Sequence, residues 1–419
     1  MTPTTVPAPT ASDLYDELGG SARSDADLVR LIADRAQIPR AEPANSFILH
    51  APLELLARAA LLPWVAADGR EPARLRLASL LAQFESEPAA ELESSPVAAV
   101  DARTAAGALV EAVASADLEA TDRAARAVAG SAQPRELAAL LGAAVLPSLA
   151  AAGHAPIFLY KYPRVAPRAE ATMGLLRPLA RELARYPQLR ISWVADRPGD
   201  GTGSADALAS ALARVPAMGI PGSTFIFPIM HQVDNGGVAA ELLGPALDGL
   251  GVDESSRVLL RTAARAMLMG PAEHVPFGWS HTLTMPQAAL AVGRSIADPQ
   301  LGVDVAGTYV VGMIAALAAA PIPTEVSLPD PGGRFDDALP QGRDVAAGWV
   351  WHAPAAALVG LPGELATRAS ARHDAHIVKY TLACLDQVAA DPEAARLYLA
   401  AAAGLLGFWA QSGEADDPM

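Results

Sequence analysis

Apolar residues recur every three or four positions along most of the chain, and proline, glycine or acidic residues separate these stretches. This spacing puts apolar side chains on one face of an α-helix, whereas a half-buried strand would alternate apolar and polar positions. Residues 25–36 are an example, because Ser24 provides an N-terminal cap and Pro39 ends the segment. Residues 71–84 repeat the pattern, with leucine at its apolar positions. The periodicity predicts an all-α fold.

Further helices are expected along the rest of the chain. Residues 101–128 and 134–152 are rich in alanine, which has the highest helix propensity. Residues 46–67 form a long apolar stretch in which Pro52 and Pro63 mark breaks or kinks. The remaining expected helices are residues 256–269, 281–297, 304–320, 364–389 and 391–409.

Four segments depart from the helical pattern. Residues 155–164 follow a helical stretch and are interpreted as helix or irregular structure. Residues 189–196 have the β-branched and aromatic content of a strand. The glycines of residues 197–204 lack the spacing of a dinucleotide-binding fingerprint, so this segment is read as a flexible loop. Residues 321–348 concentrate proline, glycine and aspartate, which predicts a long surface loop or lid.

The chain has 419 residues, of which 52% are hydrophobic, so it can bury a large core. We expect residues 1–20 to be a disordered tail, because the N-terminus is polar and rich in proline and threonine. It lacks the charged and apolar regions of a secretory signal. Residues 21–419 are expected to form one helical domain, with two lobes that divide near residues 165–255. The longest apolar run, residues 308–321, is too short to span a bilayer, so no membrane partner is expected.

The formal net charge is -15 and the chain has no stripe of lysine and arginine, which argues against nucleic-acid binding. The acidity mainly favours solubility. Cys384 is the single cysteine, which excludes an intrachain disulfide and suits a reducing compartment. The sequence therefore predicts a cytoplasmic protein.

The most informative pattern lies near the C-terminus, where His373, His376 and Lys379 follow one another at intervals of three and Tyr380 comes next. In a continuous helix these intervals put two imidazoles and an amine on one face, because successive residues advance by about 100°. The chain has only eight histidines, so two within four positions of an apolar segment indicate a chemical site.

Three further histidines, His50, His154 and His281, also lie among apolar residues. An unpaired imidazole in such surroundings costs free energy. A metal ion shared by these three histidines and His376 would satisfy all four imidazoles together. The alternative is that each histidine is a core residue bonded to a backbone carbonyl. His231, His274 and His352 stand near proline, glycine or loop residues and are expected at the surface or at a pocket rim.

These histidine blocks resemble those of the questin oxidase-like family, which comprises helical oxygenases of anthraquinone and polyketide metabolism. The similarity follows the order and spacing of the blocks around His50, His154, His281 and His376, and the most specific block is DAHIVKYTLACLDQ followed by LYLAAAAGLLGFW. Two blocks depart from the family pattern: His50 follows Phe-Ile-Leu where relatives more often have Asn, and His154 precedes Ala-Pro-Ile rather than Gly-Leu-Ile.

The resemblance implies an oxygenase that acts on a small aromatic substrate with O2. Some members are described as cofactor-independent Baeyer–Villiger oxygenases, and a related ring-cleaving member as an iron enzyme with four histidines and a carboxylated lysine. Carried over to this chain, the iron ligands would be His50, His154, His281, His376 and Lys379. In the cofactor-independent reading the same residues would act without a metal.

Lysine chemistry is compatible with this ligand set. Burial and nearby positive charge lower the pKa of a lysine, and the free amine can then add carbon dioxide to give an anionic carbamate. The alternative is that Lys379 is a surface lysine whose stem lies along the helix. The candidate catalytic residues are Lys379, Tyr380 and Asp374, of which Asp374 would orient a ligand imidazole. The candidate pocket residues are Phe158, Tyr160, Trp279 and Glu273.

Two other functions remain open from the sequence: a metal-dependent hydrolase, because a bound metal also activates water, and a helical binding protein without catalysis. The chain lacks a nucleophile elbow, a phosphate-binding P-loop, a CxxC zinc motif and a CxxCH haem motif.

Overall fold

A computed structural model describes residues 10–41, 46–91, 97, 99–165, 170–195, 202–220 and 226–413. Every regular element among these residues is a helix, which confirms the all-α prediction. Their β-type pairings are two isolated bridges, Arg40 with Ala89 and Ser148 with Arg190. The strand considered for residues 189–196 is therefore wrong, because this segment contributes one bridge and the short 3-10 turn Trp193–Ala195.

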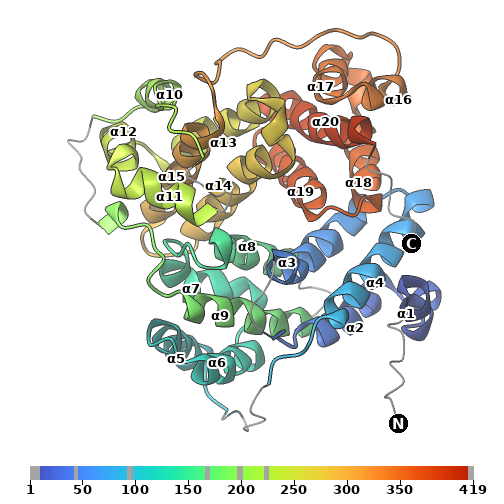
Figure 1. The fold of residues 1–419 in the computed structure, drawn as a ribbon, viewed down its shortest axis with the longest axis vertical. Coiled ribbons are helices and arrows are strands. Elements are labelled where there is room, and N and C mark those ends of the chain that lie inside the picture. The colour runs from blue at the N-terminus through green and yellow to red at the C-terminus, as the bar shows by residue number, and fades with distance from the viewer. Residues whose placement is uncertain are drawn as a thin grey trace.

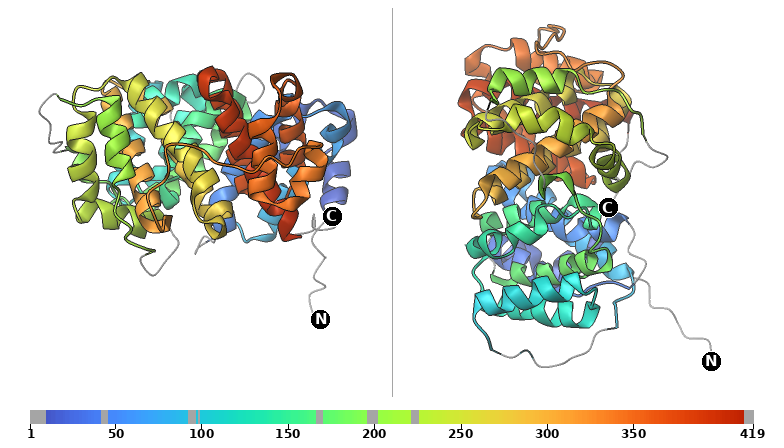
Figure 2. Two further views of the ribbon diagram at one scale, coloured as in Figure 1. Left: turned by 90° about the horizontal axis from the view of Figure 1, so that it is seen from above. Right: turned by 90° about the vertical axis from the view of Figure 1, so that its left-hand side faces the viewer.

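The helices form two groups that are stacked on each other (Figures 1 and 2). The group drawn in the lower half of Figure 1 contains α1 (Ala11–Glu17), α2 (Asp25–Ala36), α3 (Ser46–Leu61), α4 (Arg70–Ser86), α5 (Ala102–Ala114), α6 (Leu118–Ser131), α7 (Leu137–Val145), α8 (Ala155–Val165) and α9 (Leu176–Arg185). The upper group contains α10 (Ala205–Ala213), α11 (Ile226–Asn235), α12 (Val238–Leu247), α13 (Val252–Met269), α14 (Ser280–Gly293), α15 (Pro299–Leu317), α16 (Phe335–Ala338), α17 (Arg343–His352), α18 (Leu361–Ala371), α19 (Ala375–Ala390) and α20 (Ala395–Ser412). The chain passes from the lower to the upper group between α9 and α10, within the span expected to divide the lobes.

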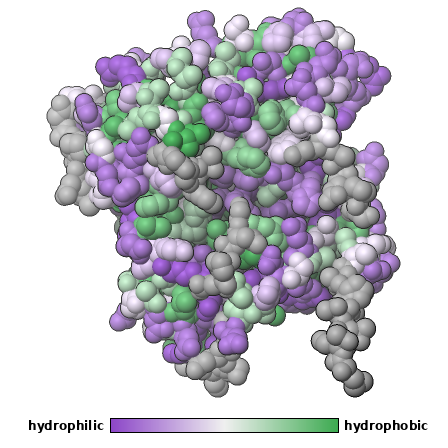
Figure 3. All heavy atoms as spheres, in the orientation of Figure 1, coloured by the Kyte–Doolittle hydropathy of each residue, from purple (hydrophilic) through white to green (hydrophobic). Residues whose placement is uncertain are grey.

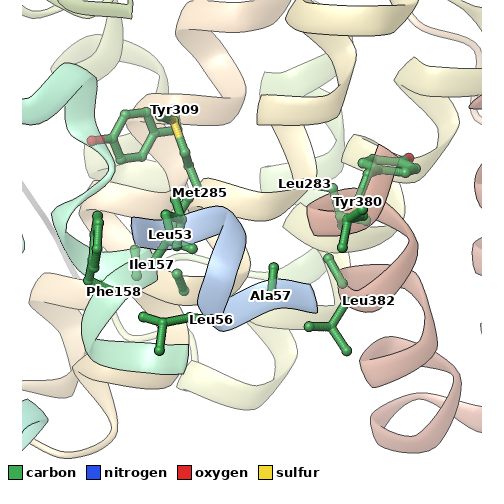
Figure 4. Close-up of a cluster of buried hydrophobic side chains, with 14 of the residues drawn as sticks. Leu53, Leu56, Ala57, Ile157, Phe158, Leu283, Met285, Tyr309, Tyr380 and Leu382 are labelled. Atoms are coloured by element: carbon green, nitrogen blue, oxygen red, sulfur yellow. The ribbon is translucent and has the colours of Figure 1, made fainter. Parts of the chain in front are cut away.

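The junction of the two groups is formed by α3 and α8 of the lower group, which pack against α19 and α14 of the upper group; outside this junction, α4 and α7 also contact α18 and α14. Figure 4 shows leucines of α3 between apolar residues of α8 and α19. Leu53, Ile157 and Leu382 are all buried there, and each such side chain contributes about 1.5–3 kcal/mol of transfer free energy. The junction is therefore a continuous apolar core, and it carries the histidines described below.

Helices that begin at a strong N-terminal cap start where the sequence predicts. The predicted boundaries of α2 are those observed, because the Ser24 hydroxyl accepts the Asp27 amide hydrogen. The single helix expected over residues 101–128 is wrong, since α5 and α6 form a hairpin. Ala116 has a φ of 59° and the Asp117 carboxylate caps α6. No glycine or proline marks this turn, so the apolar periodicity predicted a single helix across it.

The helix expected over residues 364–389 is also divided, into α18 and α19. Arg58 of α3 donates hydrogen bonds to the carbonyl oxygens of Ser370, Arg372 and His373, which α18 leaves unpaired at its C-terminal end. Asp374 then caps α19. His373 therefore lies in the break and not on the helical face of His376, because a residue more than 300 positions away terminates the first helix.

Two segments expected to be irregular contain helix. Within residues 1–20, α1 begins with a capping box at Thr10 and buries Leu14 and Tyr15, so this part is not a disordered tail; residues 1–9 lie outside the described residues. The expected loop over residues 321–348 is irregular at first but contains α16 and the start of α17. Residues 321–334 hold no helix.

Two helical stretches, Phe47–Trp64 and Pro299–Leu317, are long and apolar enough to cross a membrane by length and composition. Most of each stretch is buried inside the protein, 61% of the first and 89% of the second. Core helices pass the same test, and α15 packs against α11, α12, α13 and α14. The face drawn in Figure 3 mixes hydrophilic and apolar residues.

Candidate metal centre

Each helix of the junction places one histidine at the interface between the two groups. His50 lies near the start of α3, His281 and His376 are the second residues of α14 and α19, and His154 directly precedes α8. The four segments are far apart in sequence and meet only through the packing of α3, α8, α14 and α19.

The four imidazole rings form a closed cluster. Ring centroids are 4.7 Å apart for His50 and His154, 5.2 Å for His154 and His281, 4.9 Å for His281 and His376, and 5.2 Å for His50 and His376. Ligand nitrogens of His50, His281 and His376 all lie within 4.8 Å of one another. Because metal–nitrogen bonds are about 2 Å long, nitrogens around one ion are separated by distances of this order. The expected convergence of the histidines is therefore observed.

Hydrogen bonds orient three of the rings. Nδ1 of His154 faces the Ala151 carbonyl oxygen at 3.0 Å, Nδ1 of His281 faces the Phe277 carbonyl, and Nδ1 of His376 lies 3.2 Å from the Asp374 carboxylate. Each acceptor requires the hydrogen on Nδ1, which leaves the lone pair on Nε2, as in metal-bound histidines. Nε2 of His154 and Nε2 of His281 are 3.2 Å apart. With both hydrogens on Nδ1, two lone pairs face each other, an arrangement that a cation between them would relieve.

The backbone before His154 is strained. Ala151 and Ala152 have φ values of 50°, and Gly153 follows with a φ of 71°. Alanine in the left-handed region is uncommon and costs free energy, and such strain clusters at functional sites. A Cβ at Gly153 would lie 2.6 Å from the Tyr309 hydroxyl, so glycine is also needed for close packing. This turn brings the Ala151 carbonyl to the ring that it orients.

Lys379 follows His376 by one helical turn on α19 and is buried, with 2% of its surface exposed. Its Nζ has no hydrogen-bond partner among the described residues. Burial lowers the pKa of Lys379 to about 8, while the negative charges of Asp374 and Glu54 oppose that change. An ammonium group in this position would be poorly solvated, so a larger share of Lys379 is the neutral amine near pH 7 than for an exposed lysine.

Burial also acts on the histidines. It lowers the pKa of His154 and His281 well below the ordinary value, and it lowers the pKa of His376 despite the neighbouring Asp374. The charge of Lys379 acts in the same direction on all three. The rings are therefore neutral near pH 7, which is the form that binds a metal.

Two cavities of different character border the cluster. The first has a volume of about 420 Å³ and is mainly apolar; its walls include Ile226, Ile229, Met313 and Leu317 together with the four histidines of the cluster. The second has a volume of about 310 Å³ and is called the polar cavity because charged and polar side chains are part of its walls, among them Glu54, Arg58, Arg76, His373 and Asp374 together with His50 and His376. An aromatic ligand fits the first, and small polar molecules fit the second.

The aromatic residues expected in a substrate pocket lie elsewhere. Phe158 packs in the apolar core beside α3 (Figure 4), and the Tyr160 hydroxyl donates to Asp386. Trp279 is fully buried and donates to the Pro271 carbonyl oxygen. None of the three borders the apolar cavity, whereas Glu273 does. Trp279 precedes His281 by two residues and so points to the other side of the helix, a direction that proximity in sequence does not give.

Of the three candidate catalytic residues, two are at the cluster. Lys379 and Asp374 are placed as described, but Tyr380 is turned about 100° from Lys379 and lies in the core beside Cys384. Burial raises the pKa of Tyr380 well above its ordinary value.

The sequence reading missed Glu54, which follows His50 by one turn and forms a buried ion pair with Arg58 at 2.6 Å. The i, i+4 spacing of His50, Glu54 and Arg58 was the available signal.

The remaining histidines are at the surface or at a rim. His231 is exposed on α11 beside Asn235, and His352 is exposed with Nε2 3.0 Å from the Leu328 carbonyl oxygen. His274 borders the apolar cavity and His373 the polar one.

No protein-family model, curated protein or solved structure matches this chain. The functional argument therefore depends on the chemistry of the cluster and its two cavities.

Replacement of Asp374 separates its two roles, since it caps α19 and orients His376. Asp374→Ala should lower the free energy of unfolding by about 1 kcal/mol through loss of the cap and weaken metal binding by about 10–100-fold. Asp374→Asn keeps an oxygen acceptor and a good cap, so its stability should match the wild type and its loss of affinity should be smaller. Urea unfolding and metal titration measure both. Equal metal affinity in all three proteins would contradict the orienting role.

Proposed function

We propose that this protein is an oxygenase that acts on an aromatic polyketide-type substrate with O2, either by Baeyer–Villiger-like insertion or by ring cleavage. One observation carries the proposal: four imidazoles converge beside a buried lysine that has no hydrogen-bond partner among the described residues. The resemblance of the four histidine blocks to the questin oxidase-like family supports the same reading. Buried polar groups are normally hydrogen-bonded, so the Lys379 amine, which has no such partner among the described residues, favours a ligand beside the rings over a purely structural cluster.

The residues present fit a single divalent ion. His50, His154, His281 and His376 would supply nitrogen ligands, and the facing Nε2 atoms of His154 and His281 are the strongest sign of a cation between them. A shell of nitrogen and oxygen donors with an open position is typical of non-haem iron sites. Ferrous iron bound there would supply the electron chemistry that dioxygen requires.

Lys379 would supply the fifth donor as a carbamate. Its neutral amine attacks carbon dioxide, a nitrogen–carbon bond forms, and one proton is released to solvent. The product carries an anionic oxygen where the structure has a buried amine without a partner. The polar cavity borders His376 on the same helix and offers a route for carbon dioxide and for the proton.

The chain's other residues would hold and shield the substrate. Ile226, Met313 and Leu317 give the larger cavity apolar walls on which a flat aromatic molecule can pack. The four imidazole rings are part of the wall of this cavity, so a bound aromatic would lie against them. The apolar walls also exclude water from the reacting face.

Metal analysis and oxygen consumption test the proposal. Protein purified without chelator and supplied with ferrous iron under argon should retain about one iron per chain after desalting. It should then consume O2 only when an aromatic polyketide, such as a hydroxylated anthraquinone, is added. Iron retention with ester or amide hydrolysis and no O2 consumption would support a metal-dependent hydrolase instead. O2 consumption by metal-free protein would support the cofactor-independent mechanism, and neither iron nor turnover would leave a binding protein.

A further inference from the structure

The apolar and the polar cavity share three wall residues among those that the structure describes: His50, His376 and Phe277. Two of these are candidate metal ligands and cannot be varied without altering the ion. Phe277 is thus the one shared residue that is free to shape the space next to the cluster.

Phe277 stands against the cluster on a short π-helical segment, Val275–Trp279, that leads into α14. Its ring meets the edge of His376 at a centroid distance of 5.1 Å and that of Trp409 at 6.2 Å. The side chain is nevertheless 53% exposed, an unusual position for a large apolar residue that touches a buried histidine. Single turns of π-helix occur frequently at functional sites.

We propose that Phe277 is the specificity-determining residue of this site: its ring closes the apolar cavity against the polar one and limits how many fused rings a substrate can have. This inference rests on the proposed function, because it takes the apolar cavity to be the substrate pocket. The cavity volume of about 420 Å³ lies toward the small end of the range of about 300–1,000 Å³ found for ligand pockets. Removal of the Phe277 ring joins it to a further space of about 310 Å³.

The role of the Phe277 side chain can be separated from that of its backbone. The Phe277 carbonyl accepts the hydrogen bond from His281 Nδ1, and truncation of the side chain leaves that carbonyl in place. The half-exposed ring contributes little burial, so Phe277→Ala should fold and bind metal as the wild type does. A change in ligand preference would then come from cavity shape alone.

The test measures binding of three quinone probes to the metal-free protein by equilibrium dialysis: a dihydroxynaphthoquinone, a dihydroxyanthraquinone and a dihydroxytetracenequinone. The wild type should bind the first two and bind the four-ring probe at least 10-fold more weakly than the three-ring probe. Phe277→Ala should reduce that difference at least 10-fold, and Phe277→Leu should lie between the two proteins. Metal-free protein is used so that the result does not depend on turnover.

Phe408→Ala is the matched control, because Phe408 packs against Trp409 at 5.9 Å but borders neither cavity. It should keep the wild-type order of affinities. An unchanged difference between three and four rings in Phe277→Ala, or the same change in Phe408→Ala, would overturn the inference. Either result would leave iron binding and O2 consumption untouched, so the two proposals fail separately.

Discussion

Alanine in place of any one histidine of the cluster should abolish stable iron binding. His50→Ala, His281→Ala and His376→Ala each remove a nitrogen from a group whose members lie within 4.8 Å of one another, and His154→Ala removes the Nε2 that lies 3.2 Å from Nε2 of His281. Residues that merely orient a ligand already cost 10–100-fold in affinity when they are removed, so the loss of a ligand itself should exceed about 100-fold. Iron content after desalting should fall from about one per chain to below one tenth.

The stability of the protein provides a second measurement. An ion that binds only the folded state stabilises it by about 2.7 kcal/mol when its free concentration is 100 times the dissociation constant. Ferrous iron should therefore raise the melting temperature of the wild type and leave that of the four variants unchanged. His231→Ala is the matched control, since His231 is exposed on α11, where its ring contacts Phe227 and Asn235. Loss of iron in His231→Ala, or its retention in two or more cluster variants, would contradict a site built from these four rings.

The sequence predicted the cluster because each histidine interrupts an apolar helical segment. Such a ring must either bond to the backbone or meet another polar group, and here it does both: Nδ1 of His154 and of His281 faces a carbonyl while Nε2 faces the other ring. The class of fold was predictable for the same reason, since the helical period is a local property of the chain. Local patterns were therefore sufficient to identify the four histidines of the cluster.

The sequence could not predict in which direction some side chains point or where some helices end. Arg58 ends α18 from a distance and so removes His373 from the face of His376. Phe277 and Trp279 both lie on the π-helical turn before α14, which shifts the register of their side chains relative to His281. The strained turn before His154 had only Gly153 as its signal. These features depend on tertiary contacts, which no local period records.

Replacement of Lys379 by methionine should stabilise the metal-free protein and abolish its iron binding. Methionine has a similar length and no charge, so it removes a buried amine without a hydrogen-bond partner. The desolvation penalty of such a group is about 1–3 kcal/mol, and the free energy of unfolding should rise by this order. A residue that lowers the free energy of unfolding is expected to have a functional role. Loss of iron in Lys379→Met would identify that role as metal binding.

Lys161 offers the matched control, because it is buried to the same extent on α8 but seven residues beyond His154, about 10 Å along the helix. Burial lowers the pKa of Lys161 to about 8 as well, and its Nζ lies 3.7 Å from Asp386. Lys161→Met should therefore keep full iron content. If Lys379→Met loses iron and Lys161→Met keeps it, the loss is due to the position of Lys379 at the cluster and not to the removal of a buried lysine as such.

The proposed carbamate requires an amine that can add carbon dioxide, and Lys379→Met does not test this requirement by itself. Lys379→Ala should lose iron and O2 consumption, and Lys379→Arg should restore neither, because a guanidinium is permanently charged and does not add carbon dioxide. Wild-type protein depleted of carbon dioxide should regain activity when bicarbonate is added, and isotopically labelled bicarbonate should give one new carbonyl signal per chain. Full iron content in Lys379→Arg would show that Lys379 is no ligand, and the four histidines would then hold the ion without an anionic donor.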